Sequence, residues 1–280
     1  MILDAHQHFW RYDPLRHSWI SDEMALLRRD FLPQDLAPIY EASEVAGCIA
    51  VQADQTEAET AFLLDLASEH PWIRGVVGWA DLCSPRIEAR LEYWAEDRRL
   101  CGFRHIVQSE PDPAFMQRPD FCRGIAALGG FGFAYDILIY PHQLESAIRL
   151  ADQFPDQRFV LDHLAKPRLR GGVLEPWAAQ LRELAQRPNV CCKLSGLVTE
   201  AAWTGWSYDT LAPALDHAAE AFGARRLIYG SDWPVCLLAA EYQHVLGIVQ
   251  QQIAQWSASE QEQVLYRNAL HWYQLPHRPA

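Results

Sequence analysis

The stretch "ILDAHQHFW" at residues 2–10 begins as a short apolar run and ends in two histidines and two aromatic side chains. A run of this length, bounded by polar and aromatic residues, predicts a β-strand over residues 2–8. No glycine follows this strand, whereas an open doubly wound sheet usually carries a glycine-rich turn after its first strand. The stretch therefore favours a barrel over an open sheet.

Seven further apolar runs predict strands of the same kind. They show little polar alternation, which is typical of strands buried on both faces of a parallel sheet. Helical stretches such as 57–70 and 208–223 separate them. Eight strands alternating with helices predict a single (β/α)8 TIM barrel over residues 1–280, with an open doubly wound sheet as the alternative. The other predicted strands are 47–53, 73–80, 100–106, 133–140, 158–164, 190–196 and 226–233, and the other predicted helices include 85–97, 141–154 and 175–187.

Two segments stand apart from this alternation. The connection at 9–46 is long and aromatic, and long loops of this kind often cover a functional site. A last helix is predicted after Ser259, which forms with Glu262 the Ser-x-x-Glu pattern of a capping box. Its expected packing face consists of Val264, Leu265, Ala269 and Trp272.

Composition narrows the class of protein. Half of the 280 residues are hydrophobic and the formal net charge is −12, with "RLR" at 168–170 as the main basic cluster. Nucleic-acid binding needs a basic face, and a membrane helix needs about 18 apolar residues in a row, so we expect neither partner. The seven cysteines include no Cys-x-x-Cys pair, and no secretory signal is visible. We expect reduced thiols, a cytoplasmic location and a small-molecule substrate.

Polar side chains gather at the carboxyl ends of the predicted strands, where TIM barrels carry their active sites. Polar groups cost free energy when they are buried without partners, so this placement favours a functional explanation. The residues concerned are His6, His8, Arg104, His105, Tyr135, Asp136, Asp162, His163, Lys166, Lys193, Ser195 and Asp232.

His6 and His8 share one face of the first strand because side chains alternate with a period of two. The two imidazoles could simply bond to nearby backbone. However, His163 and Asp232 complete a set of three imidazoles and one carboxylate. Such a set suits one zinc ion, or another divalent transition metal, with a position left open for water.

Six motifs carry a family resemblance that spans nearly the whole chain. The sequence resembles the amidohydrolase superfamily, and within it the sugar-lactone hydrolases of the L-fuconolactonase and L-rhamnonolactonase type. The resemblance implies hydrolysis of a sugar lactone in sugar catabolism, with one divalent metal that is not always needed for turnover. A binuclear site is not expected, because His163 is the sole histidine at a strand end after the fourth strand. The motifs are "DAHQHFWRY" (4–12), "RRDFLPQDL" (28–36), "GFRH" (102–105), "LDHLAKP" (161–167), "CKLSGL" (192–197) and "GSDWPVC" (230–236).

Lactone hydrolysis requires an activated water and a stabilised oxyanion. Asp232 is the candidate base, and the three histidines, or a metal that they hold, are candidates to polarise the carbonyl. Arg104 and Lys166 are candidate donors to substrate hydroxyl or carbonyl groups, although Arg104 could instead form a structural salt bridge. Candidates to stack on the sugar are Trp19, Tyr135 and Trp233.

Three alternatives remain open. A metal-dependent decarboxylase of aromatic acids would share the barrel and a similar ligand set, and would require its metal. A hydrolase of another small carboxylic or aromatic lactone is a nearer alternative; aromatic dicarboxylate lactones would call for several arginines in the site, and here Arg104 alone is well placed. A barrel that binds a ligand without catalysis would show saturable binding and no product.

Overall fold

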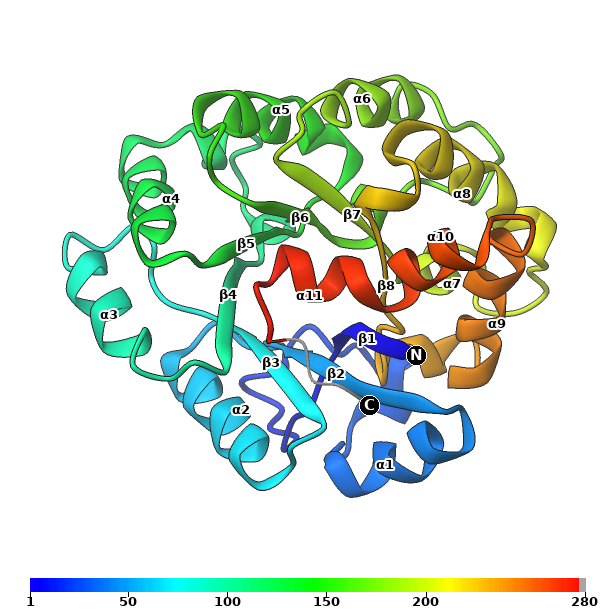
Figure 1. The fold of residues 1–280 in the computed structure, drawn as a ribbon, viewed down its shortest axis with the longest axis horizontal. Coiled ribbons are helices and arrows are strands. Elements are labelled where there is room, and N and C mark those ends of the chain that lie inside the picture. Colours follow the sequence, from blue (N-terminus) through cyan, green and yellow to red (C-terminus); the bar gives the residue numbers. More distant parts are fainter. Residues whose placement is uncertain (277–280) are drawn as a thin grey trace.

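The computed structural model describes residues 1–276 and contains eight parallel strands in the order β1 to β8, surrounded by helices (Figure 1). Each strand pairs in parallel with the next one along the chain. The predicted (β/α)8 barrel is confirmed. The strands are β1 (Ile2–Gln7), β2 (Val45–Val51), β3 (Ile73–Gly78), β4 (Leu100–His105), β5 (Ala134–Ile137), β6 (Phe159–Leu161), β7 (Val190–Leu194) and β8 (Leu227–Tyr229).

The barrel closes between β1 and the segment that follows β8. Gln7 and Trp233 form a parallel bridge, and the backbone N–H of Asp232 donates to the carbonyl of His6 at 2.7 Å. The backbone N–H of His8 donates to the carbonyl of Trp233, also at 2.7 Å. The backbone bonds that close the sheet thus hold His6 of β1, and His8 just after it, beside Asp232.

The helices lie outside the strands, and the five predicted helices are present with shorter ends. The prediction that Ser259 caps the last helical segment is wrong. The N-cap residue is Ser257, whose hydroxyl accepts a hydrogen bond from the Glu260 backbone N–H at 3.3 Å. The capping pattern occurs twice in "SASEQE", and the helix uses the earlier one. The helices are α1 (Pro33–Ala42), α2 (Glu57–Glu69), α3 (Ile87–Trp94), α4 (Pro119–Phe131), α5 (Leu144–Gln153), α6 (Trp177–Leu184), α7 (Leu197–Glu200), α8 (Tyr208–Phe222), α9 (Tyr242–Gln252), α10 (Ala258–Glu262) and α11 (Asn268–Trp272).

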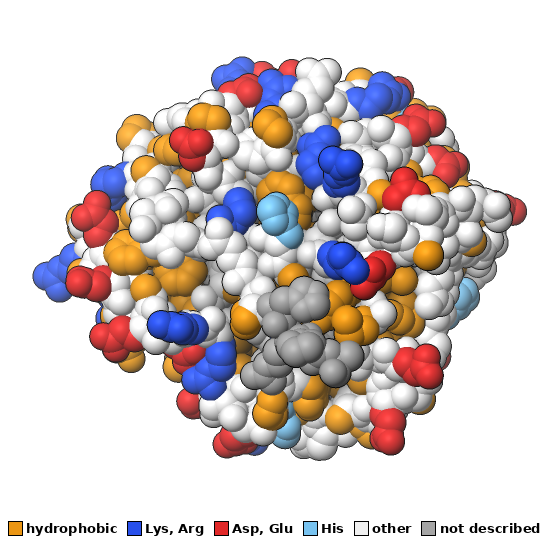
Figure 2. All heavy atoms as spheres, viewed as in Figure 1, with side chains coloured by type: hydrophobic (Ala, Val, Ile, Leu, Met, Phe, Trp, Pro, Cys, Tyr) orange, Lys and Arg blue, Asp and Glu red, His pale blue; other side chains and the backbone are white. Residues whose placement is uncertain are grey.

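The C-terminal segment covers the amino-terminal end of the barrel. Figure 1 looks onto this end, where α11 crosses in front of the strands. Tyr266, Leu270 and Tyr273 pack with Leu3 and Ile49, which point into the barrel. Figure 2 shows acidic and basic side chains interspersed on this face. Because the C-terminal segment closes the amino-terminal end of the barrel, the functional site is expected at the opposite end, where the carboxyl ends of the strands lie.

Strand residues alternate between the barrel interior and the layer beneath the helices. Ala134 faces the interior, whereas Tyr135 packs with the apolar residues under the helices. Within residues 1–276, no helix is both long and apolar enough to cross a lipid bilayer.

Candidate active site

Four of the predicted residues meet at the carboxyl end of the barrel. The Oδ1 atom of Asp232 lies 3.3 Å from His8 Nε2, 3.8 Å from His6 Nε2 and 3.9 Å from His163 Nε2. All four side chains are almost fully buried. The structure therefore brings one carboxylate and three imidazoles from β1 and the segments after β6 and β8 into one cluster.

Unusual backbone conformations aim two of these side chains. Asp232 has φ of 59° and His163 has φ of 52°, and residues 163–166 are all left-handed. Such conformations cost non-glycine residues roughly 1–3 kcal/mol each and persist where the surroundings fix them. Gly196 permits the arrangement, because a Cβ at that position would lie 2.5 Å from His163 Nδ1. The turns also explain why β6 and β8 end earlier than the sequence pattern suggested.

The hydrogen-bond partners of His6 and His8 indicate which nitrogen of each ring carries the proton and which carries the lone pair. His8 Nδ1 lies 2.7 Å from the carbonyl of Val51, so it must donate, and Nε2 keeps its lone pair in the neutral ring. His6 Nε2 lies 3.2 Å from Arg104 Nη1, which can only donate. His6 Nδ1 lies 3.2 Å from Asp162 Oδ1 and 3.1 Å from Lys193 Nζ. Because Nδ1 has a carboxylate acceptor beside it, whereas Nε2 faces the guanidinium, we assign the ring proton to Nδ1 and the lone pair to Nε2.

In the neutral ring, the lone pair of His8 Nε2 faces the Asp232 carboxylate at 3.3 Å, and His6 Nε2, which accepts from Arg104, lies 3.8 Å from the same carboxylate. Acceptors placed this close to one another call for a cation or protons between them. The ligand atoms of His6, His8 and Asp232 lie within 4.8 Å of one another, and a second group of this kind contains His6, Asp162 and His163. Tetrahedral zinc with bonds of about 2.0–2.1 Å needs ligand atoms about 3.3–3.4 Å apart. The separation of 3.3 Å between Asp232 Oδ1 and His8 Nε2 has this value, and that of 3.8 Å to His6 Nε2 is somewhat longer. The donor set fits one divalent ion.

Burial and charge set the protonation of the cluster. Burial lowers the pKa of His163 to about 4 and lowers the pKa of His6 well below its ordinary value. Burial alone would raise the pKa of Asp232, but the neighbouring His163, His8 and His6 lower it by more, and the net shift is downward. At neutral pH the site offers an ionised Asp232 beside neutral His6 and His163.

A buried charge network lies directly beneath the cluster. Lys193 Nζ lies 2.6 Å from Asp136 Oδ2 and 2.9 Å from Asp162 Oδ1. The hydroxyl of Tyr273 lies 2.8 Å from both oxygens of Asp136. Together with Arg104, which pairs with Asp162 at 3.0 Å, the two cations balance the two carboxylates in a region closed to water.

Arg104 is 4% exposed, and all of its donors are directed inward. Its Nη1 faces His6 and Asp162, and its Nε and Nη2 face the side chain and carbonyl of Gln52. A guanidinium has five N–H donors, and five acceptor contacts surround it here. The structure thus shows the salt bridge with Asp162 and leaves no donor free for a substrate.

Comparison with known proteins places this site in a family. A sequence profile of amidohydrolases matches residues 3–275. The chain belongs to the amidohydrolase family. It is 42% identical to an L-fucono-1,5-lactonase of Burkholderia multivorans, over 98% of this chain and 96% of that protein.

Two crystal structures of an amidohydrolase from Burkholderia multivorans are also similar to this amidohydrolase. One contains zinc, with 43% identity and a TM-score of 0.95 over 99% of this chain and all of that chain. The other contains HEPES, with 42% identity and a TM-score of 0.94 over the same shares. The zinc-bound relative agrees with the fit of the donor set to a divalent ion.

The remaining predicted residues lie at different depths in the amidohydrolase. Lys166 is half-buried, and its Nζ lies 3.7 Å from Glu200 Oε1. Trp19, on the long loop after β1, is 39% exposed. Tyr135 is fully buried against Phe121 and Phe159, and Trp233 is buried against Phe9 and Phe31. The structure therefore separates Tyr135 and Trp233 from the open side of the cluster, while Lys166 and Trp19 remain accessible.

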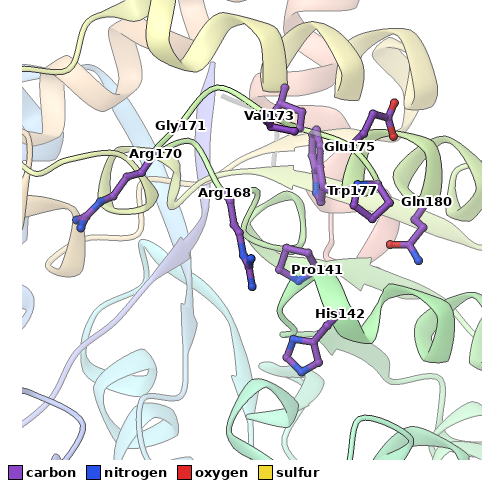
Figure 3. A pocket seen from close by; sticks show the side chains of 11 residues that line it. Pro141, His142, Arg168, Arg170, Gly171, Val173, Glu175, Trp177 and Gln180 are labelled. Atoms are coloured by element: carbon purple, nitrogen blue, oxygen red, sulfur yellow. The ribbon is translucent and has the colours of Figure 1, made fainter.

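A cavity of about 490 Å³ lies beside the site, between the segments that follow β5 and β6. Figure 3 shows Arg168 extending toward Pro141 and His142, whereas Arg170 points away from them. None of the four cluster residues lines this cavity. We therefore place the chemistry at the cluster and treat the cavity as separate from it.

Sequence reasoning did not assign a role to several groups that shape the site. Gln52 was visible as a polar residue at the end of a predicted strand, and Asp136 and Asp162 adjoin residues of the predicted site. Tyr273 gave no such signal, because it reaches Asp136 from the C-terminal segment that plugs the other end of the barrel.

Proposed function

We propose that this amidohydrolase hydrolyses a sugar lactone of the L-fuconolactone type to the aldonic acid, as part of sugar catabolism. The observation that carries this proposal is the near full-length 42% identity to an L-fucono-1,5-lactonase. The cluster around Asp232 supports the proposal because it supplies an ionised base next to imidazoles in a water-poor site. A decarboxylase or a ligand-binding barrel is not favoured by a relative of this kind.

The base in this proposal is Asp232. Its carboxylate takes a proton from a water molecule as the water oxygen attacks the lactone carbonyl carbon, which gives a tetrahedral oxyanion. Collapse of this intermediate breaks the bond between the carbonyl carbon and the ring oxygen. Asp232 then returns the proton to that oxygen, so the ring opens to a hydroxyl and a carboxylic acid, which ionises at neutral pH.

His163 is the candidate donor that stabilises the negative charge developing on the oxyanion. Its Nδ1 lies 2.8 Å from the hydroxyl of Ser195. When that hydroxyl donates to Nδ1, the proton of the neutral ring is on Nε2, which faces the cluster and can donate to the oxyanion. A divalent metal held by His6, His8 and Asp232 would add Lewis-acid polarisation of the carbonyl and a lower pKa for bound water.

Two accessible residues are candidates for substrate contacts. Lys166 places a cation at the rim of the cluster, where it can donate to sugar hydroxyls. Trp19 presents a partly exposed ring on the long loop, suited to stacking on a sugar. Arg104 instead positions His6 and Asp162.

A pH-indicator screen tests the activity directly. The purified protein is mixed with L-fucono-1,5-lactone, with other sugar lactones, with an aromatic dicarboxylate lactone and with a dihydroxybenzoate, with and without chelator. The proposal expects proton release from sugar lactones above the spontaneous rate, and strongest for the L-fucono compound. Loss of CO₂ from the benzoate, or saturable binding with no product from any lactone, would contradict it.

A further inference from the structure

The guanidinium of Arg104 contacts a histidine nitrogen that could also bind a metal ion. Its Nη1 lies 3.2 Å from Nε2 of His6, the ring nitrogen that lies 3.8 Å from Asp232 Oδ1 in the group of His6, His8 and Asp232. One sp² nitrogen has a single lone pair, so it can accept a hydrogen bond or bind a metal, and it cannot do both. We propose that Arg104 and a divalent cation compete for Nε2 of His6, so that Arg104 limits how much metal the site holds.

The surrounding contacts hold Arg104 in this competing position. Gln52 receives its Nε and Nη2 donors, and Asp162 receives a second donor from Nη1 at 3.0 Å. Neither Gln52 nor Asp162 belongs to the group of His6, His8 and Asp232, although Asp162 also contacts His6 Nδ1, and both are buried. Arg104 therefore keeps most of its hydrogen bonds when it releases His6, which makes exchange with a cation feasible.

The tautomer of His6 is the same in both states. With Arg104 or with a metal at Nε2, the ring proton is assigned to Nδ1, which lies 3.2 Å from Asp162 Oδ1 and 3.1 Å from Lys193 Nζ. Asp162 thus prepares His6 for either partner, and Arg104 decides which one is present. A cation at Nε2 would also meet the positive charge of Arg104 at close range, which adds repulsion to the lost hydrogen bond.

Zinc affinity measured against a competing chelator tests this competition without any substrate, so the result is independent of lactonase activity. The full-length wild type is compared with Arg104→Gln and Arg104→Lys. Freeing one lone pair from a hydrogen bond and removing a like charge should tighten the zinc Kd of Arg104→Gln about tenfold or more. Arg104→Lys keeps the charge but lacks the fork that reaches both Gln52 and His6, so we expect intermediate tightening.

The matched control is Arg168→Gln, which removes an exposed arginine at the same end of the barrel with no contact to His6. Its zinc Kd should stay within about twofold of wild type if charge at a distance is screened. An unchanged or weaker Kd in folded Arg104→Gln overturns the proposal. Tightening in Arg104→Gln with none in Arg104→Lys assigns the effect to charge alone and overturns competition for the lone pair. If Arg104→Gln does not fold, the Arg104→Lys result decides.

Discussion

Replacing Lys193 with methionine should destabilise the protein strongly, because Lys193 lies fully buried between two carboxylates. Its Nζ contacts Asp136 at 2.6 Å and Asp162 at 2.9 Å. Removing one partner of a buried ion pair leaves an uncompensated charge and typically costs about 3–5 kcal/mol of unfolding free energy. Arg104 still neutralises Asp162 in the variant, so the uncompensated charge falls on Asp136.

The loss of stability caused by Lys193→Met should be larger at high pH than at low pH, because it depends on the ionisation of Asp136. Burial raises the pKa of Asp136 to about 6 even with Lys193 beside it, against 3.8 in the unfolded chain. Loss of Lys193 raises the pKa of Asp136 further, so the folded variant takes up a proton that the unfolded chain does not bind. Stability of the variant then increases as pH falls through the raised folded pKa, and each tenfold gain in the proton affinity of Asp136 corresponds to about 1.4 kcal/mol. The penalty should be largest at pH 8 and smaller at pH 5 by more than about 1 kcal/mol.

Urea denaturation at pH 5, 6, 7 and 8, followed by circular dichroism, measures this penalty. The double variant with Asp136→Asn should recover part of the lost stability at pH 8. Lys166→Met is the matched control, because Lys166 belongs to a half-exposed pair with Glu200 and should cost no more than about 1 kcal/mol. A penalty for Lys193→Met below about 1 kcal/mol, or one that does not change with pH, would refute the reasoning.

Three further predictions concern the cluster and its rim. Burial lowers the pKa of His163 to about 4 from 6.5, so the unfolded chain binds the extra proton and stability falls as pH drops from about 6.5 to 4. The unfolding free energy should fall by about 3 kcal/mol over this range. His163→Asn lacks the titrating imidazole, so the urea midpoints of wild type and variant should approach each other as the pH is lowered. Ser195→Ala removes the 2.8 Å hydrogen bond to His163 and should lower kcat about tenfold with little change in KM; an unaltered kcat would count against this orienting role. Lys166→Met should raise KM for the lactone about tenfold while kcat changes little, and an unchanged KM would remove Lys166 from the substrate site.

Much of the architecture was predictable because strand residues in a parallel barrel are buried on both faces. The runs at 47–53 and 190–196 are mostly apolar, with Gln52 in the first and Lys193 and Ser195 in the second, and both overlap a strand in the structure. The period of two along residues 2–8 also indicates correctly that His6 and His8 point to the same side. Strand ends were less predictable, because β6 ends at Leu161, two residues before the left-handed His163, and β8 ends at Tyr229, three residues before the left-handed Asp232.

The sequence does not predict which residues of a strand face the barrel interior. Tyr135 and Asp136 are neighbours on β5, and a shift of one residue reverses which of them faces the interior. Asp136 faces Lys193 in the barrel, and Tyr135 packs under the helices. The partners of Arg104 were hidden for another reason: Gln52, His6 and Asp162 come from three different strands or strand ends, and only the closed barrel brings them together.

Turnover of L-fucono-1,5-lactone by wild type and by Asp232→Asn, measured by proton release at saturating substrate, tests the role of Asp232 most directly. The amide has nearly the same shape as the carboxylate and cannot accept the proton of the attacking water. We predict lactone hydrolysis by the wild type and a kcat lower by about 10² or more in Asp232→Asn. Turnover by Asp232→Asn close to that of wild type would contradict the assignment of Asp232 as the base, and no turnover by either protein would contradict the proposed lactonase activity.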